Sequence, residues 1–429
     1  MNKILLSLML VAALVSCNDY EDSFGYRIDV SSESVENVID ADADGYTVQL
    51  GHPVALVDGN AEISDVYFKL DTEGEEKVVK AKKEGNLYIL EEKLPYDIYV
   101  DIYSYAIVNG EEQELHHWSY CFSKYSFAPE ITNIRVSTRN LGSLTVMANY
   151  SNPFPNMKLT EAYLNIGSRS YKMTVLDGEV YCNVDLYDLG YVKNAIPLLT
   201  LGNDISSASL PPYCFITNNV YSVENYDTSD DGKTVDGCLY LAGTKWGKGM
   251  LVEDNSGKYS LDKNTYLGDR CFYYPRNTQT AYCFQGEYDD PVTKALGSDW
   301  MTPTKEQMEK LLTCCSIQRI CTETSAGGKR WGYVVYPAKG NRRVHCDLAT
   351  DCLENEYLTS IRDKGVYMEV VTENVSSSRS VYYGTSTLTE VYKNWYGEWY
   401  FYLLKADLTY GFTWGHNLIA GKYYMPIKK

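Results

Sequence analysis

Residues 171–184 read YKMTVLDGEVYCNV, and this stretch decides the class of fold that the sequence predicts. Two runs, Tyr171–Val175 and Val180–Val184, lie on either side of Asp177-Gly178. An Asp-Gly pair adopts positive φ angles at little cost and therefore suits the tight turn of a β-hairpin. Both runs are rich in β-branched and aromatic residues, which favour strands. We therefore expect an antiparallel hairpin here, inside a β-rich domain.

The alternating pattern extends on both sides of this hairpin. Phe127-Ala128-Pro129 marks a boundary, after which Ile131–Val136 and Leu144–Ala148 again alternate between apolar and polar residues. Alternation with a period of two is typical of strands that are buried on one face. We expect a β-sandwich over residues 127–217.

The residues before this boundary show the same alternation of apolar and polar residues. Three short alternating runs recur, at Tyr46–Leu50, Val66–Leu70 and Asp97–Tyr103. In the third run, Ile98, Val100 and Ile102 share one face. An Asn109-Gly110 turn and a length of about 100 residues suit a seven-stranded sandwich. Residues 26–126 resemble an immunoglobulin or fibronectin type III module, so we expect an immunoglobulin-like β-sandwich.

The N-terminus has the layout of an export signal. Lys3 precedes an uncharged apolar run, Ile4–Val15, and Ser16 and Cys17 follow it. The run is shorter than the ~20 residues that a membrane-spanning helix needs. We therefore interpret residues 1–16 as a signal peptide that is removed.

Leu14–Cys17 resembles the lipobox of bacterial lipoproteins, in which the cysteine is acylated and becomes the mature N-terminus. The resemblance implies a lipid on Cys17, and acyl chains that each contribute ~0.8 kcal/mol per buried methylene would hold the protein on a membrane. Residues 17–25 form an acidic tether. Its cluster Asn18–Asp22 resembles the signal that sends Bacteroidota-type lipoproteins to the cell surface, which implies an outer-membrane location.

Composition narrows the classes of partner. The chain of 429 residues has a formal net charge of -18, which disfavours nucleic acid because the phosphate backbone would be repelled. The 40 tyrosines fit β-rich extracellular domains. There are 12 cysteines, and export permits disulfides, but the spacing does not determine their connectivity. Several could instead be small buried side chains.

No pattern in the sequence indicates catalysis, a cofactor or a metal. There is no nucleophile elbow, zinc-protease motif or phosphate-binding loop, so we expect a protein that is not an enzyme. His116 and His117 are adjacent and would point to opposite faces of a strand. Asp227, Asp230 and Asp231 are the nearest calcium-like group, but a solvated turn accounts for them better.

Residues 218–429 differ in composition, because they contain more Trp, Tyr and Gly, and they include one segment whose pattern predicts a helix. The spacing of Thr304 and Gln307 predicts a capping box at the start of a helix that runs to Thr313. Met308, Leu311 and Leu312 form the apolar stripe of a helix that packs on a core.

The order of motifs here resembles the Fibrobacter succinogenes major paralogous (FISUMP) domain, whose fold is similar to that of C-type lectins. Three segments carry the resemblance: Val235–Trp246, Leu296–Thr304 with the later Leu311-Leu312, and Tyr333–Arg342. The last third departs from the family, because Val366–Val370 lacks its Trp-Ser-Ser-Thr strand and Gly421–Pro426 matches its closing strand only in part. The resemblance implies an α+β C-type-lectin-like domain after the two sandwiches.

Within that domain, the residues do not match known active or calcium sites of the fold. The sugar-binding Glu-Pro-Asn or Gln-Pro-Asp signature of calcium-dependent lectins does not occur, and no cysteine follows Cys352 to form the copper site of formylglycine-generating enzymes. Aromatic residues concentrate near the C-terminus instead. We predict Trp395, Tyr396, Trp399 and Trp414 as ligand-binding rings, since Trp and Tyr dominate binding hot spots; the alternative is that alternate rings of these strands pack in the core.

These observations favour a non-catalytic cell-surface lipoprotein that presents a lectin-like domain for glycan binding or adhesion, with a glycan or a surface protein as its partner. A structural or scaffold component of a fimbrial or polysaccharide-uptake complex is the alternative. A hydrolase of the cell envelope is the third reading, because the carboxylate pair of a glycosidase has no fixed sequence spacing.

Overall fold

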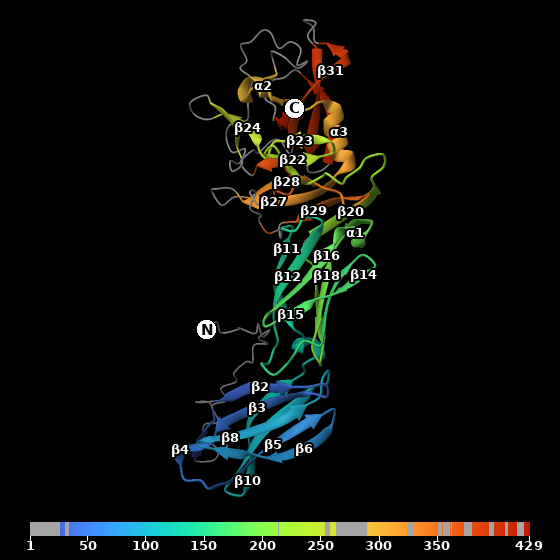
Figure 1. The fold of residues 1–429 in the computed structure, drawn as a ribbon. Coiled ribbons are helices and arrows are strands. Elements are labelled where there is room, and N and C mark those ends of the chain that lie inside the picture. Colours follow the sequence, from blue (N-terminus) through green and yellow to red (C-terminus); the bar gives the residue numbers. More distant parts are fainter. Residues whose placement is uncertain are drawn as a thin grey trace. The chain divides into compact units, whose positions relative to one another are not determined.

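The computed structural model describes residues 26–30, 34–212, 214–253, 258–262, 290–323, 329–350, 354, 361, 363–372, 380–393, 399–407, 411–417 and 424–429. The predicted signal peptide (1–16) and tether (17–25), with Cys17, lie outside this set. Strands dominate the described residues and form several sandwich-like sheets, so the predicted mostly β class is confirmed (Figure 1). Among these residues, no helix has the length and apolarity needed to cross a membrane.

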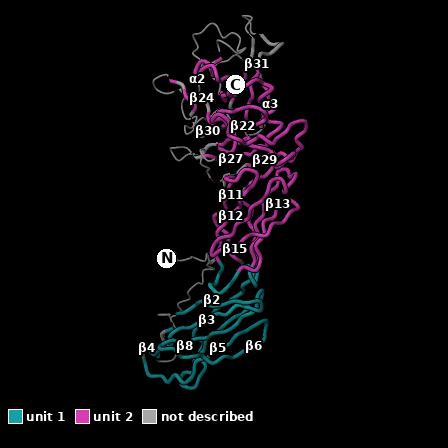
Figure 2. Tube along the Cα trace, viewed as in Figure 1, with its two compact units in different colours: residues 1–128, 152–158, 203–206 teal, residues 129–151, 159–202, 207–429 magenta. Residues whose placement is uncertain are grey.

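The chain forms two compact units (Figure 2). Unit 1 comprises residues 1–128, 152–158 and 203–206, and unit 2 comprises the rest. The domain boundary predicted after residue 126 lies close to the end of the first segment of unit 1. The boundary predicted after residue 217 falls inside the strand β20 (Cys214–Ser222).

Unit 1 contains two four-stranded antiparallel sheets and a two-stranded pair. The first sheet has the order β10-β9-β5-β6, with β5 Ile63–Thr72, β6 Glu75–Lys80, β9 Val100–Val108 and β10 Glu111–Tyr120. The second has the order β2-β3-β8-β7, with β2 Val35–Ala41, β3 Tyr46–Pro53, β7 Lys82–Glu84 and β8 Leu87–Leu94. The pair is β1 (Tyr26–Asp29) with β4 (Ala55–Gly59), and a 3-10 turn, Lys124–Phe127, ends the unit's first segment.

Both four-stranded sheets contribute to one apolar core. Val48 and Leu50 on β3, and Phe68 on β5, belong to the same buried cluster. Strand β9 follows the predicted alternation, because Val100 and Ile102 are buried in this cluster. The predicted start of that strand at Asp97 is wrong: the residue has a φ of 60°, and this left-handed conformation interrupts the extended chain until Val100.

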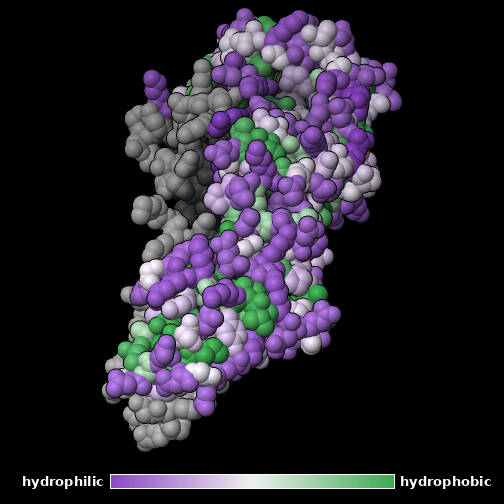
Figure 3. Space-filling view, turned by 90° about the horizontal axis from the view of Figure 1, so that it is seen from below, coloured by the Kyte–Doolittle hydropathy of each residue, from purple (hydrophilic) through white to green (hydrophobic). Residues whose placement is uncertain are grey.

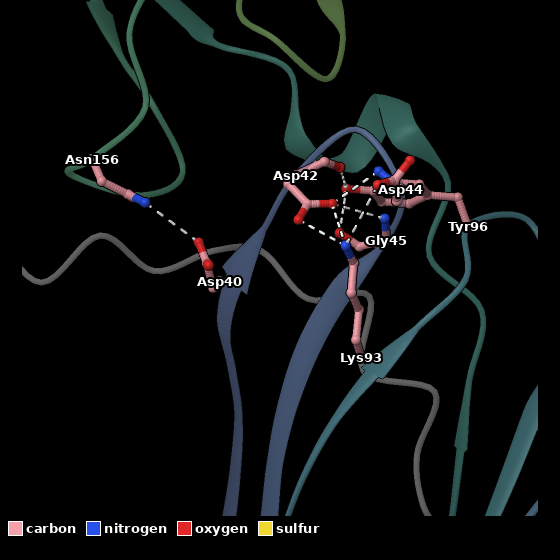
Figure 4. A network of polar contacts seen from close by, with 7 residues as sticks. All are labelled: Asp40, Asp42, Asp44, Gly45, Lys93, Tyr96 and Asn156. Atoms are coloured by element: carbon pink, nitrogen blue, oxygen red, sulfur yellow. Dashed lines mark hydrogen bonds and ion pairs between the residues drawn. The ribbon is translucent and has the colours of Figure 1, made fainter.

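Polar contacts hold the turn between β2 and β3 in place (Figure 4). The hydroxyl of Tyr96 donates to the carbonyl oxygens of Asp42 (2.7 Å) and Gly45 (3.0 Å), and the Lys93 ammonium pairs with the carboxylate of Asp42 at 2.7 Å. A Cβ on Gly45 would lie 2.3 Å from the carbonyl oxygen of Leu94, so only glycine fits there. The turn is therefore tied to the end of β8.

Unit 2 begins with two more four-stranded antiparallel sheets. The first has the order β11-β12-β16-β15, with β11 Glu130–Ser137, β12 Ser143–Ser151, β15 Thr174–Leu176 and β16 Glu179–Asp185. The second has the order β14-β13-β18-β19, with β13 Glu161–Ile166, β14 Arg169–Lys172, β18 Leu198–Gly202 and β19 Ser207–Leu210. A short helix, α1 (Leu186–Leu189), follows β16 and is capped by Asp185.

The predicted hairpin is present, with one correction. Leu176 pairs with Glu179 across Asp177-Gly178, and Gly178 has a φ of 73°. The run Tyr171–Val175 is not a single strand, because β14 and β15 belong to different sheets. Met173 lies between them with its side chain buried, and its amide donates to the carbonyl of Ala162, so the chain crosses from one layer to the other at this residue.

The rest of unit 2 is built on a six-stranded sheet with the order β17-β20-β29-β27-β28-β30. Its further strands are β17 Val192–Ala195, β27 Ser316–Glu323, β28 Lys329–Tyr336, β29 Arg342–Thr350 and β30 Val366–Thr372. A five-stranded sheet has the order β21-β22-β23-β34-β26, with β21 Thr234–Val235, β22 Cys238–Leu241, β23 Thr244–Trp246, β26 Trp300–Met301 and β34 Ile427–Lys428.

Two smaller sheets and two helices complete the described part of unit 2. β24 (Met250–Glu253) pairs with β25 (Tyr259–Asp262), and β31 (Ser380–Lys393), β32 (Trp399–Asp407) and β33 (Gly411–Asn417) form a three-stranded sheet. The helices are α2 (Pro291–Leu296) and α3 (Lys305–Cys314). Helix α3 confirms the predicted helix, including its capping box and its buried Met308 and Leu311.

The six-stranded sheet is buried on both faces. Val334 and Val335 are neighbours on β28, and strand alternation sends them to opposite faces. Val334 joins a core that also contains Leu144 and Leu164 of the preceding sandwich, while Val335 joins a second core with Leu311 of α3. The sheet thus completes the core of the sandwich and also supports the C-terminal elements.

The described surface is mainly polar where Figure 3 shows it. Hydrophilic residues cover most of that view, and hydrophobic residues lie in small separate groups. This distribution agrees with the acidic composition.

Candidate functional site

The candidate site lies where the N-terminus of α3 meets the β31-β32-β33 sheet of unit 2 (Figure 1). Helix α3 begins at Lys305 because Thr304 caps it: the Gln307 amide donates to Thr304 Oγ1 at 3.1 Å, and the Thr304 amide donates to Gln307 Oε1 at 2.8 Å. This reciprocal cap fixes the position of the first helical residue, Lys305.

Two aromatic side chains come from the sheet. Tyr402 lies on β32 and Trp414 on β33, and the register pairs Trp414 with Leu404. Tyr402 and Leu404 are two residues apart on one strand, so all three side chains share a face. Leu404 is buried in the core beside α3, whereas Tyr402 and Trp414 are only partly buried. The two rings therefore lie at the rim of this core.

The rings and the lysine form a compact cluster. The ring centroids of Tyr402 and Trp414 are 6.5 Å apart with an interplanar angle of 89°, which is an edge-to-face pair. The Lys305 Nζ atom lies 4.1 Å from the centroid of Tyr402 and 5.5 Å from that of Trp414. Its second partner is Glu309, whose Oε1 is 3.5 Å away. Both the lysine and the glutamate remain accessible to solvent.

Threonines of β31 connect the helix to the sheet. The Lys305 amide donates to Thr387 Oγ1 at 2.9 Å, and the Thr385 hydroxyl donates to the carbonyl of Tyr402 at 2.7 Å. The first residue of α3 and the backbone of β32 are therefore held by the same strand.

This set of groups is suited to binding. Partly exposed aromatic rings provide an apolar surface, an ammonium donates hydrogen bonds, and a carboxylate accepts them. The ammonium over the ring faces is a cation–π arrangement, which disfavours a second cation at the same place. The site as described thus fits a neutral or acidic polyhydroxyl ligand better than a cationic one.

The structure places the predicted ring residues unequally. Trp414 is part of the cluster. Trp395 and Tyr396 lie outside the described residues, and Trp399 begins β32 but its side chain is not among those described. Tyr402 and Lys305 are not among the residues that the sequence predicts for the site. Tyr402 has the same strand parity as the buried Leu404, and this was the one signal that could have placed it on the core-facing side.

The acidic residues considered for calcium serve separate roles. Asp231 accepts hydrogen bonds from the Tyr226 hydroxyl (2.6 Å) and the Ala242 amide (2.9 Å), and burial raises the pKa of its carboxyl. Asp230 pairs with Lys233, and Asp227 accepts from the amide of Ser229. Within the part of the chain that the structure describes, no three His, Cys, Asp or Glu side chains gather as a metal would require.

The histidine pair is divided between two environments. His117 stacks on Tyr103 with centroids 4.3 Å apart, and its Nε2 lies 3.2 Å from Asp101. His116 instead contacts the ring of Trp118, with centroids 4.3 Å apart. The two rings therefore do not converge on a common ligand.

Several cysteines are core residues. Cys182 and Cys346 belong to the sandwich core and Cys315 to the core beside α3. Burial raises the pKa of each of these thiols, which keeps them protonated. They behave as small apolar side chains rather than nucleophiles.

No family model and no curated protein matches this chain. Among solved structures, a chimeric titin Z1Z2-Z1Z2 tandem carrying a GRGDS peptide from fibronectin shares 14% identity, with coverage of 41% of this chain and 96% of its own and a TM-score of 0.17. The GH family 64 laminaripentaose-producing β-1,3-glucanase from Paenibacillus barengoltzii, complexed with laminarihexaose, shares 8% identity, with coverage of 53% and 63% and a TM-score of 0.16. Likenesses this low carry no argument about fold or function.

Proposed function

We propose that this chain is a non-catalytic lipoprotein of the outer membrane, anchored through a lipid on Cys17, that presents a C-terminal lectin-like domain for glycan binding. In this proposal residues 26–126 and 127–217 are immunoglobulin-like sandwiches, and residues 218–429 form a FISUMP domain of C-type-lectin-like fold. The observation that carries the binding function is the cluster of Tyr402, Trp414 and Lys305, in which two partly exposed rings surround an ammonium.

Glycan binding is tested with the soluble chain that lacks residues 1–17. A glycan array identifies ligands, and affinity electrophoresis measures them for the wild type, Tyr402→Leu and Trp414→Leu. Loss of a stacking ring costs ~1–2 kcal/mol, so binding should weaken by roughly tenfold in each variant. Tyr163→Leu is the matched control, because Tyr163 is an exposed ring on β13 of the same unit and should leave the affinity unchanged.

Three results would overturn the proposal in different ways. If both ring variants bound the glycan with wild-type affinity, the assignment of the site to Tyr402 and Trp414 would be wrong. Absence of any glycan ligand would favour the scaffold function, and release of sugar from a polysaccharide would show a hydrolase. Anchoring is tested separately by labelling cells with radioactive palmitate: the wild type should incorporate the label and Cys17→Ala should not.

A further inference from the structure

The outer face of the β10-β9-β5-β6 sheet in unit 1 carries tyrosines and carboxylates in ordered rows. The register aligns Lys69 with Tyr103 and His117, and in the next row Tyr67 with Tyr105 and Glu114. Because directly opposed residues share a face, these side chains lie on one surface. The intervening residues Phe68 and Ile102 point into the core. This surface is independent of the ring cluster in unit 2.

The rings on this face are stacked against one another. Tyr67 and Tyr105 have centroids 5.7 Å apart with an interplanar angle of 18°, and the Tyr103–His117 pair is also nearly parallel. The Tyr67 hydroxyl donates to Glu112, and the Tyr105 hydroxyl donates to Glu114. Each of these four rings therefore faces a neighbouring ring, and carboxylates accept hydrogen bonds from the hydroxyls of Tyr67 and Tyr105.

A lysine of the chain shows which chemistry the face accommodates. The Lys69 Nζ atom lies 4.5 Å from the centroid of Tyr105 and 2.7 Å from Glu112 Oε1. An ammonium thus lies between a ring and a carboxylate, with attraction to both. The same ammonium lies 5.9 Å from the centroid of Tyr67, so one lysine serves both stacked rings and one carboxylate.

The adjacent row concentrates negative charge. Glu76 on β6 is opposite Asp71 on β5, which in turn is opposite Asp101 on β9. Like charges at directly opposed positions destabilise a sheet. Among the described residues, no lysine or arginine forms an ion pair with any of the three. Asp101 makes its 3.2 Å contact with His117. Lys69 in the adjacent row interacts electrostatically with Glu76, but it forms its ion pair with Glu112, so a further positive partner would reduce the repulsion within the row.

We propose that this face binds a polypeptide segment rich in lysine or arginine, whose cationic side chains lie between the tyrosine rings and the row formed by Glu76, Asp71 and Asp101. Charge complementarity decides the occupant, because the row repels anionic ligands. Arginine would bind more tightly than lysine, since its planar guanidinium both stacks on rings and forms paired hydrogen bonds with carboxylates.

Binding is tested with the soluble chain lacking residues 1–17 and a fluorescein-labelled peptide of six Arg-Gly repeats, by anisotropy at 0.15 M salt. The double variant Asp71→Asn/Asp101→Asn should weaken binding about tenfold or more. Tyr105→Leu keeps the charge but removes a ring, and should weaken it roughly threefold. The corresponding Lys-Gly peptide should bind more weakly than the arginine peptide.

The matched control removes the same charge elsewhere in unit 1. Glu91→Gln/Asp97→Asn changes two exposed carboxylates outside this face, and binding should change less than twofold. Thermal unfolding establishes that each variant is folded; relief of the Asp71–Asp101 repulsion should leave the melting temperature unchanged or higher.

Several outcomes would overturn the proposal. Equal losses in the face and control variants would show that only net charge matters. Absence of peptide binding by the wild type would rule out the site. Tighter binding of cellohexaose than of the peptide, with a loss confined to Tyr105→Leu, would show that the face binds a sugar instead. The Trp414→Leu variant separates the two sites, because it should bind the peptide like the wild type whether or not the proposed glycan function holds.

Discussion

Tyr96 illustrates how much structure one side chain can hold. Its ring is buried between Tyr46 and Phe127, with centroids 5.8 and 5.6 Å away, and its hydroxyl serves two carbonyls of the β2–β3 turn. The Gly45 carbonyl also accepts a hydrogen bond from the Asp42 amide at 2.9 Å, so the hydroxyl reinforces a turn that a backbone hydrogen bond already closes.

We predict that Tyr96→Phe lowers the free energy of unfolding of unit 1 by about 1 kcal/mol, because the carbonyls of Asp42 and Gly45 lose the Tyr96 hydroxyl as a donor while the ring packing remains. Urea unfolding followed by circular dichroism measures the change. Tyr125→Phe, at a ring that is 79% exposed, is the control and should match the wild type. Equal stability of the two variants would contradict the role given to the hydroxyl.

His52 makes the stability of unit 1 depend on pH. The side chain is fully buried, its Nε2 lies 2.7 Å from Ser104 Oγ, and burial lowers its pKa below the ordinary value. The unfolded chain therefore takes up a proton at higher pH than the folded chain does. The contribution of His52 to stability is therefore fully present above about pH 6.5 and is lost as the pH falls below it.

The pH dependence can be assigned to this residue by comparison. The urea midpoint of the wild type should fall between pH 7.5 and pH 5.5, and His52→Gln should show a smaller fall whatever its absolute stability. A slope unaffected by His52→Gln would show that other groups cause it.

At the scale of elements, α3 shows that a local signal can be sufficient. Thr304 and Gln307 form both hydrogen bonds of the capping box, and these bonds depend only on residues three apart in sequence. The helix then places Lys305 beside the sheet. The cap therefore affects both the stability of the helix and the geometry of the candidate site.

Thr304→Ala should destabilise unit 2 by about 1 kcal/mol, because the Gln307 amide loses its acceptor at the start of the helix. Thr304→Ser should retain most of the stability, since serine supplies the same hydroxyl oxygen. Differential scanning calorimetry measures both. If the alanine and serine variants melt together, the cap does not contribute to folding.

Local sequence predicts the assignment of strands to sheets less well than it predicts the bounds of the helix. The run Tyr171–Val175 has a strand-like composition throughout, yet Met173 divides it between two sheets. Composition and alternation do not encode which layer a strand joins. The sheet that a strand joins depends on hydrogen-bond partners on other strands, such as the Ala162 carbonyl of β13, which accepts from the Met173 amide.

At the scale of the molecule, the six-stranded sheet makes the middle sandwich dependent on the C-terminal elements. Val344 and Leu348 of β29 lie in the same core as Leu144 and Val146 of β12. Residues separated by about 200 positions in the chain thus exclude water from one another. The sandwich core is incomplete without them.

A fragment of residues 129–212 should therefore not unfold cooperatively, whereas a fragment of residues 129–429 should. Far-UV circular dichroism during urea unfolding distinguishes the two, with a sigmoidal transition expected only for the longer fragment. A cooperative transition for residues 129–212 alone would show that the sandwich core is complete without β20, β27, β28 and β29.

The sequence by itself determined the features that arise from neighbouring residues: the mostly β class, the Asp177-Gly178 turn and helix α3 with its cap. Turn conformation and helix capping depend on interactions within a few residues, so both can be predicted from the sequence. Only the tertiary structure decided that one sheet serves two cores and that Lys305 lies over the rings of Tyr402 and Trp414. These contacts join segments about 100 residues or more apart, and alternation identifies a buried face without identifying what covers it.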